Sequence, residues 1–185
     1  GGALAAVALL LAPRLSRVII PSSFPLAFLH PYGSHPGLET LWSIPGLDLT
    51  HDSTREDRHD KAQAIAPWPL ARRNLRVCWQ PHTPGLNCGR CRKCLTTQAW
   101  LRGFCGGYDW PTFPQRLDLE ALSRVRLNSP SMHSRFFSLR DHLRATGRDP
   151  ELFSAVNQML ENHRRRSPDG PWHQWAVRVL ARLRS

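Results

Sequence analysis

The order of apolar and polar positions predicts an α/β arrangement at the start of the chain. Residues 1–12 are almost entirely apolar and predict an amphipathic or buried helix. A β-branched run at 17–21 predicts a buried strand, and the alternation over 47–52 predicts a second strand. A helix, a short loop and a strand in this order form one half of a parallel α/β unit.

Between and after these strands the pattern is less regular. An aromatic, Pro- and Gly-rich stretch at 24–36 predicts a loop, and 37–43 predicts a short helix. Ser53 or Thr54 is expected to cap a further helix that ends near Ala66, because hydroxyl side chains favour helix N-termini.

Helical spacing dominates from about residue 115, with Gly147 and Gly170 at plausible helix ends. We therefore expect the C-terminal portion of a parallel-sheet, Rossmann-like α/β domain, a cysteine-rich module and an α-helical extension. These parts are expected at 1–69, 70–110 and 111–185, respectively. The helices are expected at 117–122, 131–145, 150–165 and 172–184.

Composition narrows the class of protein. The chain has 185 residues, 41% of them hydrophobic, which is enough for a core and excludes wholesale disorder. No apolar run reaches the roughly 18–20 residues that a membrane span needs, so no membrane partner is expected. The net charge is +11, and every basic residue is Arg except Lys61 and Lys93. Coding bias and selection for anion binding both explain this preference.

The N-terminus and the cysteines bear on compartment. The apolar start has no basic segment before it and no small-x-small cleavage site behind it, so we favour a buried helix over a signal peptide. The first residues are Gly1 and Gly2 rather than Met, which suggests a processed product or a fragment. Four of five cysteines fall within 17 residues, unlike a disulfide scaffold, so we expect a reducing, cytoplasmic setting.

The strongest motif is Cys78-x9-Cys88-x2-Cys91-x2-Cys94. A Cys-x2-Cys turn brings two sulfurs close enough to share one ion, and four such donors complete a tetrahedral site. Gly89 lies inside the turn, where a positive φ is often needed. We expect a zinc ion in this motif. Four thiolates leave no open position for water, so the site is expected to be structural.

Three alternatives concern the same residues. The Cys-x2-Cys-x2-Cys run also opens ferredoxin motifs, although no fourth Cys follows at the ferredoxin spacing. Four unrelated buried thiols are a second alternative. His82 could replace one ligand, but it lies in a proline-framed loop and is left out. Cys105 is interpreted as an ordinary small core residue.

The module around these cysteines is basic. From Ala62 to Gly107 there is no acidic residue, and seven basic ones give +7. A zinc tetrathiolate carries a formal charge of −2, so some of this charge is left for an anionic partner such as phosphate or RNA.

A second set of polar residues follows the predicted strands. Ligands of open α/β sheets bind beyond the carboxyl ends of the strands. The set could form a substrate or nucleotide site there. It could equally be a satisfied loop, with Ser34 as a helix cap, His35 as a buried hydrogen-bonding partner and Arg55 paired with Asp52. The members are Ser22, Ser23, Gly33, Ser34, His35, Asp52, Arg55 and Lys61.

The cysteine motif resembles the zinc module of 7-cyano-7-deazaguanine synthases, which belong to the PP-loop ATP pyrophosphatase superfamily with an adenine nucleotide α-hydrolase-like fold. The segment that carries the resemblance runs from Asn87 to Cys94 with Cys78 before it. The helix around Lys61 and the Tyr32–Glu39 loop match the family more loosely. The chain is also similar to a group of bacterial proteins that carry a Gly-Ser-His-Pro segment and an Asn-Cys-Gly-x-Cys-x-Lys-Cys motif.

The resemblance implies ATP-dependent activation of a carboxylate or carbonyl with release of pyrophosphate, using ATP and Mg²⁺. Ser22, Ser23, Ser34, His35 and Lys61 would help to form the pocket for a small-molecule substrate or the nucleotide. The family's Ser-Gly-Gly-x-Asp-Ser loop is absent from these residues, so it is expected upstream and these 185 residues alone are expected to be inactive. Gly-Ser-His-Pro replaces the family's substrate loop.

A different class of function remains open from the sequence. A basic zinc knuckle could bind RNA or DNA without catalysis, with Trp79, Trp100 and Trp110 stacking on bases. Trp79 adjoins a metal ligand and is expected to pack around the site instead. The Arg164–Arg166 run is expected to be a solvated helix end. The sequence leaves the substrate and the oligomeric state undetermined.

Overall fold

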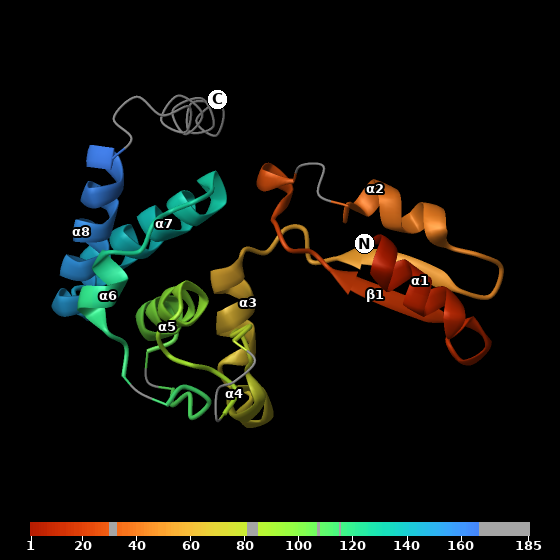
Figure 1. The fold of residues 1–185 in the computed structure, drawn as a ribbon, viewed down its shortest axis with the longest axis horizontal. Helices are drawn as coiled ribbons and strands as arrows, with labels where there is room; N and C mark the ends of the chain where they lie inside the picture. The colour runs from red at the N-terminus through yellow and green to blue at the C-terminus, as the bar shows by residue number, and fades with distance from the viewer. Residues whose placement is uncertain (30–32, 81–84, 107, 115, 167–185) are drawn as a thin grey trace. The chain divides into compact units, whose positions relative to one another are not determined.

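The computed structural model describes residues 1–29, 33–80, 85–106, 108–114 and 116–166. Contacts divide the chain into two compact units, Gly1–Arg58 and a second that begins at His59 (Figure 1). The division expected from the sequence, into parts at 1–69, 70–110 and 111–185, stays a prediction.

The first unit contains a small parallel sheet, as the sequence predicts. Strand β1 spans Arg17–Pro21 and strand β2 spans Asp48–Asp52. The two pair in parallel, with Ile20 opposite His51. Parallel pairing brings the carboxyl ends of both strands to one edge of the sheet. Ser22, His51 and Asp52 lie at this edge.

Two helices accompany this sheet. Helix α1 spans Gly2–Leu10 and helix α2 spans Pro36–Glu39, followed by the 3₁₀ turn η3 at Thr40–Trp42. The short helix expected at 37–43 is therefore present as α2 and η3 together. Shorter 3₁₀ turns, η1 at Ala12–Arg14 and η2 at Leu26–Phe28, lie on either side of β1.

The core of this unit lies on one face of the sheet. Ala5 and Ala8 of α1 are buried with Ile20 and Leu49, and small side chains let the helix approach the strands closely. On the opposite face Ile19 is 59% exposed. The outer side of α1 is also apolar and exposed, with Leu4, Val7 and Leu10 on the surface.

Helix α3 begins later than the sequence predicts. It spans Arg58–Ile65, whereas Ser53 or Thr54 was expected to cap it. Ser53 has a φ of 60°, in the left-handed region, so it turns the chain after β2 and cannot hold the extended backbone of a helix N-cap. The helix ends before Pro67, as predicted.

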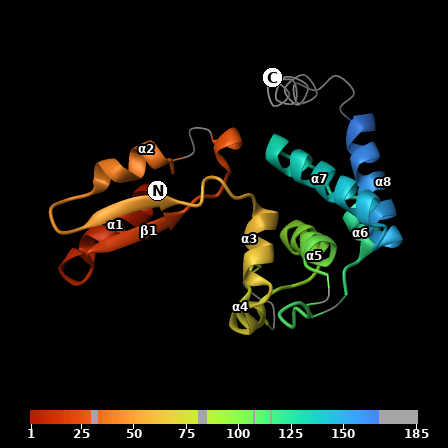
Figure 2. The same cartoon turned by 180° about the vertical axis from the view of Figure 1, so that it is seen from behind.

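The second unit is helical. Helix α4 spans Pro69–Asn74 and α5 spans Arg92–Phe104. Both views place α5 between α3 and the group α6 to α8 (Figures 1 and 2). The last three helices confirm the expected helical extension. They are α6 at Leu119–Ser123, α7 at Pro130–Thr146 and α8 at Pro150–Arg166.

Local capping explains the bounds of the last helices. Asp118 accepts a hydrogen bond from the Ala121 N–H at the start of α6, and Ser129 accepts one from Met132 at the start of α7. Gly147 ends α7 with a φ of 62°, as its position in the sequence predicts. The Arg164–Arg166 run ends α8 and is exposed.

The core of the second unit joins α5 to α6, α7 and α8. Phe136, Leu139, Leu152 and Val156 are fully buried there. At Gly103 an added Cβ would lie 2.4 Å from Cδ1 of Leu139, so a larger residue would force Leu139 to move and this close contact between α5 and α7 favours a glycine.

Among the described residues no helix is long and apolar enough to cross a membrane. The helix expected at 172–184 and the turn at Gly170 lie outside the described residues.

Candidate metal centre and strand-end cluster

The four cysteines of the motif come together in the second unit. Cys78 lies after α4, Cys88 lies in the turn before α5, Cys91 is the N-cap of α5 and Cys94 lies in its first turn. Their sulfur atoms all lie within 4.8 Å of one another. The prediction that these residues form one cluster is confirmed.

The spacing of the sulfurs fits a single ion. Cys78 Sγ lies 3.9 Å from Cys91 Sγ, and Cys88 Sγ lies 3.8 Å from Cys94 Sγ. A tetrahedron with metal–sulfur bonds of about 2.3 Å has edges of about 3.8 Å, so these distances are compatible with zinc. An iron–sulfur cluster distributes its cysteines over several irons, which requires wider spacing.

A buried asparagine holds the two parts of the cysteine motif together. The Asn87 Oδ1 atom accepts hydrogen bonds from the backbone N–H groups of Val77 and Cys78, at 2.8 and 3.1 Å. Its Nδ2 atom donates to the carbonyls of Leu75 and Thr112, at 2.8 and 3.2 Å. Asn87 is 2% exposed. Sequence reasoning assigned it no role; its place beside the first cysteine of the turn was the available signal.

The turn between Cys88 and Cys91 has the geometry that the sequence predicts. Gly89 has a φ of 72°, and its carbonyl accepts a hydrogen bond from Gln98 of α5 at 3.3 Å. The Cys91 N–H points to Cys88 Sγ at 3.3 Å, and the Gln80 N–H points to Cys78 Sγ at 3.4 Å. Backbone N–H groups aimed at sulfur stabilise thiolates, which are the form that binds metal.

The sulfurs differ in their proton affinity. Burial acts to raise the pKa of Cys88, but the N–H groups of Cys91 and Arg90 outweigh it and lower the pKa to about 6. Burial raises the pKa of Cys91. Burial and the neighbouring Cys91 thiol raise the pKa of Cys94. Four thiolates at one point therefore require a cation to displace the remaining protons.

Cys105 is separate from this cluster, as predicted. It is 4% exposed and packs with Ala66 and Leu101. Burial raises its pKa to about 11, which keeps it a neutral thiol. His82 lies outside the described residues.

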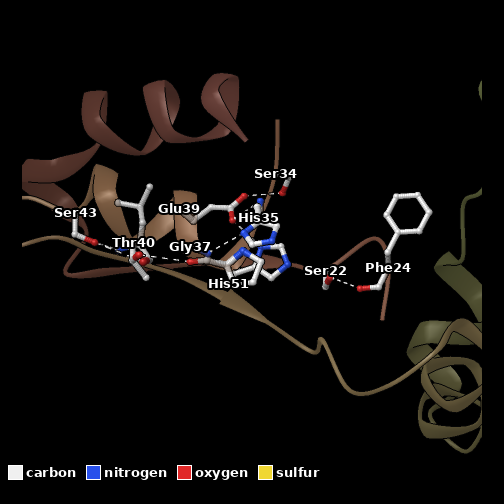
Figure 3. Close-up of polar contacts among 11 residues, drawn as sticks. Ser22, Phe24, Ser34, His35, Gly37, Glu39, Thr40, Ser43 and His51 are labelled. Carbon is white, nitrogen blue, oxygen red and sulfur yellow. Dashed lines mark hydrogen bonds and ion pairs between the residues drawn. The ribbon is translucent and has the colours of Figure 1, made fainter. Parts of the chain in front are cut away.

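The first unit has its own polar cluster, centred on Glu39 (Figure 3). This side chain is fully buried. One carboxylate oxygen accepts a hydrogen bond from Ser34 Oγ at 2.6 Å, and the other accepts one from the His35 N–H at 2.9 Å. His51 Nδ1 lies 2.8 Å from the same second oxygen. Helix α2 therefore supplies an acid to the end of β2.

Glu39 stays ionised in this setting. Burial acts to raise its pKa, but the hydrogen bonds from Ser34 and His51, the charge of His51 and the His35 N–H together lower the pKa below its usual value. Glu39 falls in the expected short helix at 37–43 and in the Tyr32–Glu39 loop, and the sequence assigns it no role of its own. Its spacing from Ser34 gave no sign that it would be buried.

His51 is oriented by this carboxylate. Its side chain is 2% exposed. In the neutral ring, a carboxylate at Nδ1 places the proton there and leaves Nε2 as an acceptor. Nε2 is buried and has no hydrogen-bond partner among the described residues.

The predicted strand-end residues fall into three groups. Ser34 and His35 join the Glu39 cluster, and the His35 side chain caps α2 by accepting from the Gly37 N–H. Ser34 is thus not the cap. Ser22 is buried at the end of β1 and donates to the Phe24 carbonyl at 2.6 Å. His35 is exposed, and the expectation that it is buried is wrong.

Of the other residues predicted at the strand ends, four are exposed, and Lys61 lies in the second unit. Asp52 accepts a hydrogen bond from Ser53 Oγ at 2.7 Å. Lys61 lies on α3 in the second unit, half-buried, and so belongs to a different unit from the rest. Tyr32 lies outside the described residues. The exposed members of the set are Ser23, Gly33, Asp52 and Arg55.

The three tryptophans nominated for base stacking differ sharply. Trp100 is 6% exposed and packs on Phe136, with ring centroids 5.3 Å apart. Trp110 is half-buried against the small core around Cys105. Trp79 is 81% exposed, so the expectation that it packs around the cysteines is wrong. Its ring instead carries Lys93, whose Nζ lies 3.5 Å from the ring centroid.

Comparison with known proteins adds no relationship to these sites: no family model, no curated protein and no solved structure matches the chain.

Proposed function

We propose that the four cysteines bind a structural zinc ion and that the α/β unit forms part of the substrate pocket of an ATP-dependent enzyme of PP-loop type. The geometry of the sulfurs supports the first part, and the Glu39 cluster at the carboxyl edge of the parallel strands supports the second.

This donor set fits a structural zinc site better than a catalytic metal site. Cys78, Cys88, Cys91 and Cys94 provide four thiolate donors and leave no coordination position for water or substrate. Bound zinc would offset half of the negative charge of the four thiolates and tie the segment after α4 to the start of α5. Its contribution is therefore to folding.

The zinc assignment is tested on purified protein by elemental analysis and by unfolding. We expect one zinc per chain and a colourless solution. Cys94→Ser should lose the metal and lower the unfolding temperature, because a buried hydroxyl replaces a ligand. Cys105→Ser is the matched control and should keep the zinc. A brown protein containing iron would contradict the assignment.

Two observations support the larger enzyme. The cluster of Glu39, Ser34, His35 and His51 lies where open α/β sheets bind ligands. The unit also exposes apolar surface on both sides, at Ile19 and on the outer face of α1. Parallel sheets are normally covered on both faces, so a larger α/β domain would account for this surface.

In this proposal the polar cluster around Glu39 and the loop residues beside it bind and orient the substrate. His35 and Gly33 are exposed at the edge of the loop, while Glu39 fixes the positions of Ser34 and His51. ATP and Mg²⁺ would be held by a Ser-Gly-Gly-x-Asp-Ser loop supplied from outside these 185 residues.

The measurement is ATP-dependent release of pyrophosphate. We expect turnover from a protein that joins these residues to such a loop, and none from the 185 residues alone. Glu39→Gln should lower turnover at least tenfold, whereas the exposed Glu56→Gln should leave it unchanged. Robust turnover by the isolated 185 residues would contradict the proposal.

A further inference from the structure

A groove of about 350 Å³ lies beside the N-terminal turn of α5. It is formed by the turn before α5, the first residues of α5, and the end of α6 with the segment that follows. Its floor is apolar and its charged lining consists only of arginine. The lining residues are Arg90, Arg92, Leu95, Ala121, Arg124, Val125 and Arg126.

Carboxylates compensate only part of the positive charge in this groove. Arg124 pairs with Glu120 one turn earlier on the chain. Arg90, Arg92 and Arg126 form no ion pair with any carboxylate in the described part of the chain, and all four arginines are exposed. Neighbouring guanidinium groups repel one another unless an anion lies between them. Their planar forks match the oxygen atoms of a phosphate.

An exposed tryptophan stands at the same end of α5. Lys93 follows Arg92 in the first turn of this helix, and its ammonium covers one face of the Trp79 ring. With 81% of Trp79 exposed, the remaining ring surface is open to solvent. An open aromatic face and a basic groove at the same end of one helix form the combination that binds unpaired bases.

We propose that the arginine groove and Trp79 bind single-stranded nucleic acid. Arg90, Arg92 and Arg126 bind successive phosphates, and Trp79 stacks on a base. A single strand fits better than a duplex, because stacking requires an unpaired base. A strand also fits better than a free nucleotide, because a groove with exposed walls encloses little of a small ligand. This inference does not rest on the proposed ATP-dependent activity.

The test is fluorescence anisotropy with labelled single-stranded DNA and RNA of mixed sequence, on the zinc-loaded protein. With three phosphates neutralised, the slope of log K against log salt should be about −2. Affinity should therefore fall roughly twentyfold between about 50 and about 200 mM salt. The duplex of the same sequence should bind more weakly. Equal or tighter binding of the duplex overturns the proposal.

Variants separate the two parts of the surface. The double variant Arg92→Gln/Arg126→Gln should weaken binding and reduce the salt slope by about 1.4. Trp79→Ala should weaken binding about tenfold with little change of slope, because it removes stacking rather than charge. Trp79→Phe should retain most of the affinity.

Matched controls exclude a general charge effect. Arg148→Gln and Trp68→Ala change exposed residues of the same types elsewhere in this unit and should leave binding unchanged. Each variant is checked for zinc content. If Arg92→Gln lowers the zinc content, the binding test relies on Arg126→Gln alone, because Arg126 lies outside the cysteine motif. Heparin binding as tight as the oligonucleotide, with Trp79→Ala and Arg148→Gln behaving alike, overturns the proposal.

Discussion

At the scale of single residues, two buried polar side chains organise this protein. Asn87 connects the two parts of the cysteine motif, and Glu39 collects three hydrogen bonds at the end of the strands. Each is almost completely shielded from water, so each polar atom depends on its protein partners.

We expect Asn87→Ala to lower the free energy of unfolding by at least about 2 kcal/mol, because it leaves buried N–H and carbonyl groups of the backbone without partners. Urea unfolding of the zinc-loaded protein measures this loss. Asn74→Ala removes an exposed amide that bonds only the Leu70 carbonyl, so it should cost far less. Equal losses of unfolding free energy in the two variants would show that the buried hydrogen bonds of Asn87 contribute no more than the exposed one of Asn74.

The lowered pKa of Glu39 predicts a pH effect on the first unit. An acid whose folded-state pKa lies below its unfolded value of about 4.3 contributes stability above that pH. This contribution is lost as pH falls through the folded-state pKa. Glu39→Gln should therefore destabilise the protein at neutral pH by about 1–3 kcal/mol and flatten its acid-induced loss of stability. A Glu56→Gln control should keep the wild-type pH profile; an unchanged profile in both variants would contradict the prediction.

At the scale of elements, a salt bridge ties the end of α5 to the start of α8. Arg102 donates to both carboxylate oxygens of Asp149, at 2.6 and 2.9 Å. Asp149 also caps α8 by accepting from the Leu152 N–H at 3.1 Å. The same carboxylate therefore serves a tertiary contact and a helix terminus.

These two roles can be separated by substitution. Arg102→Gln should cost roughly 1 kcal/mol, because the pair is partly solvent-exposed. Asp149→Asn should cost a similar amount, since Asn remains a good N-cap. Asp149→Ala removes the cap as well and should cost about 1 kcal/mol more. Thermal or urea unfolding gives the three values, and an Asp149→Asn loss as large as that of Asp149→Ala would disprove the separation.

At the scale of the whole molecule, the candidate metal centre belongs to one of two compact units. The cysteines lie entirely in the unit that begins at His59, whereas β1 and β2 lie in Gly1–Arg58. Their cores are also separate, one around Leu49 and one around Phe136.

Removal of the proposed zinc ion should therefore act locally. After treatment with a strong chelator, we expect hydrogen exchange to accelerate across 75–104 and to change little across 17–52. Re-addition of zinc should restore protection. Equal loss of protection in both segments would show that the metal supports the entire chain.

Local signals in the sequence determined several features of this protein. The strands at 17–21 and 48–52, the capped helices α6 and α7, and the grouping of four cysteines all follow from nearby residues: hydrophobic period, capping side chains and cysteine spacing. These are short-range properties, which a linear pattern records directly.

Only the tertiary structure decided the rest. Burial of Glu39, the fourfold bonding of Asn87, the exposure of Trp79 and the meeting of Arg92 with Arg126 depend on contacts between distant segments. The late start of α3 depends on a left-handed Ser53, which no capping rule signalled. A side chain's burial and its partners are set by how elements pack, and residue type alone does not encode that packing.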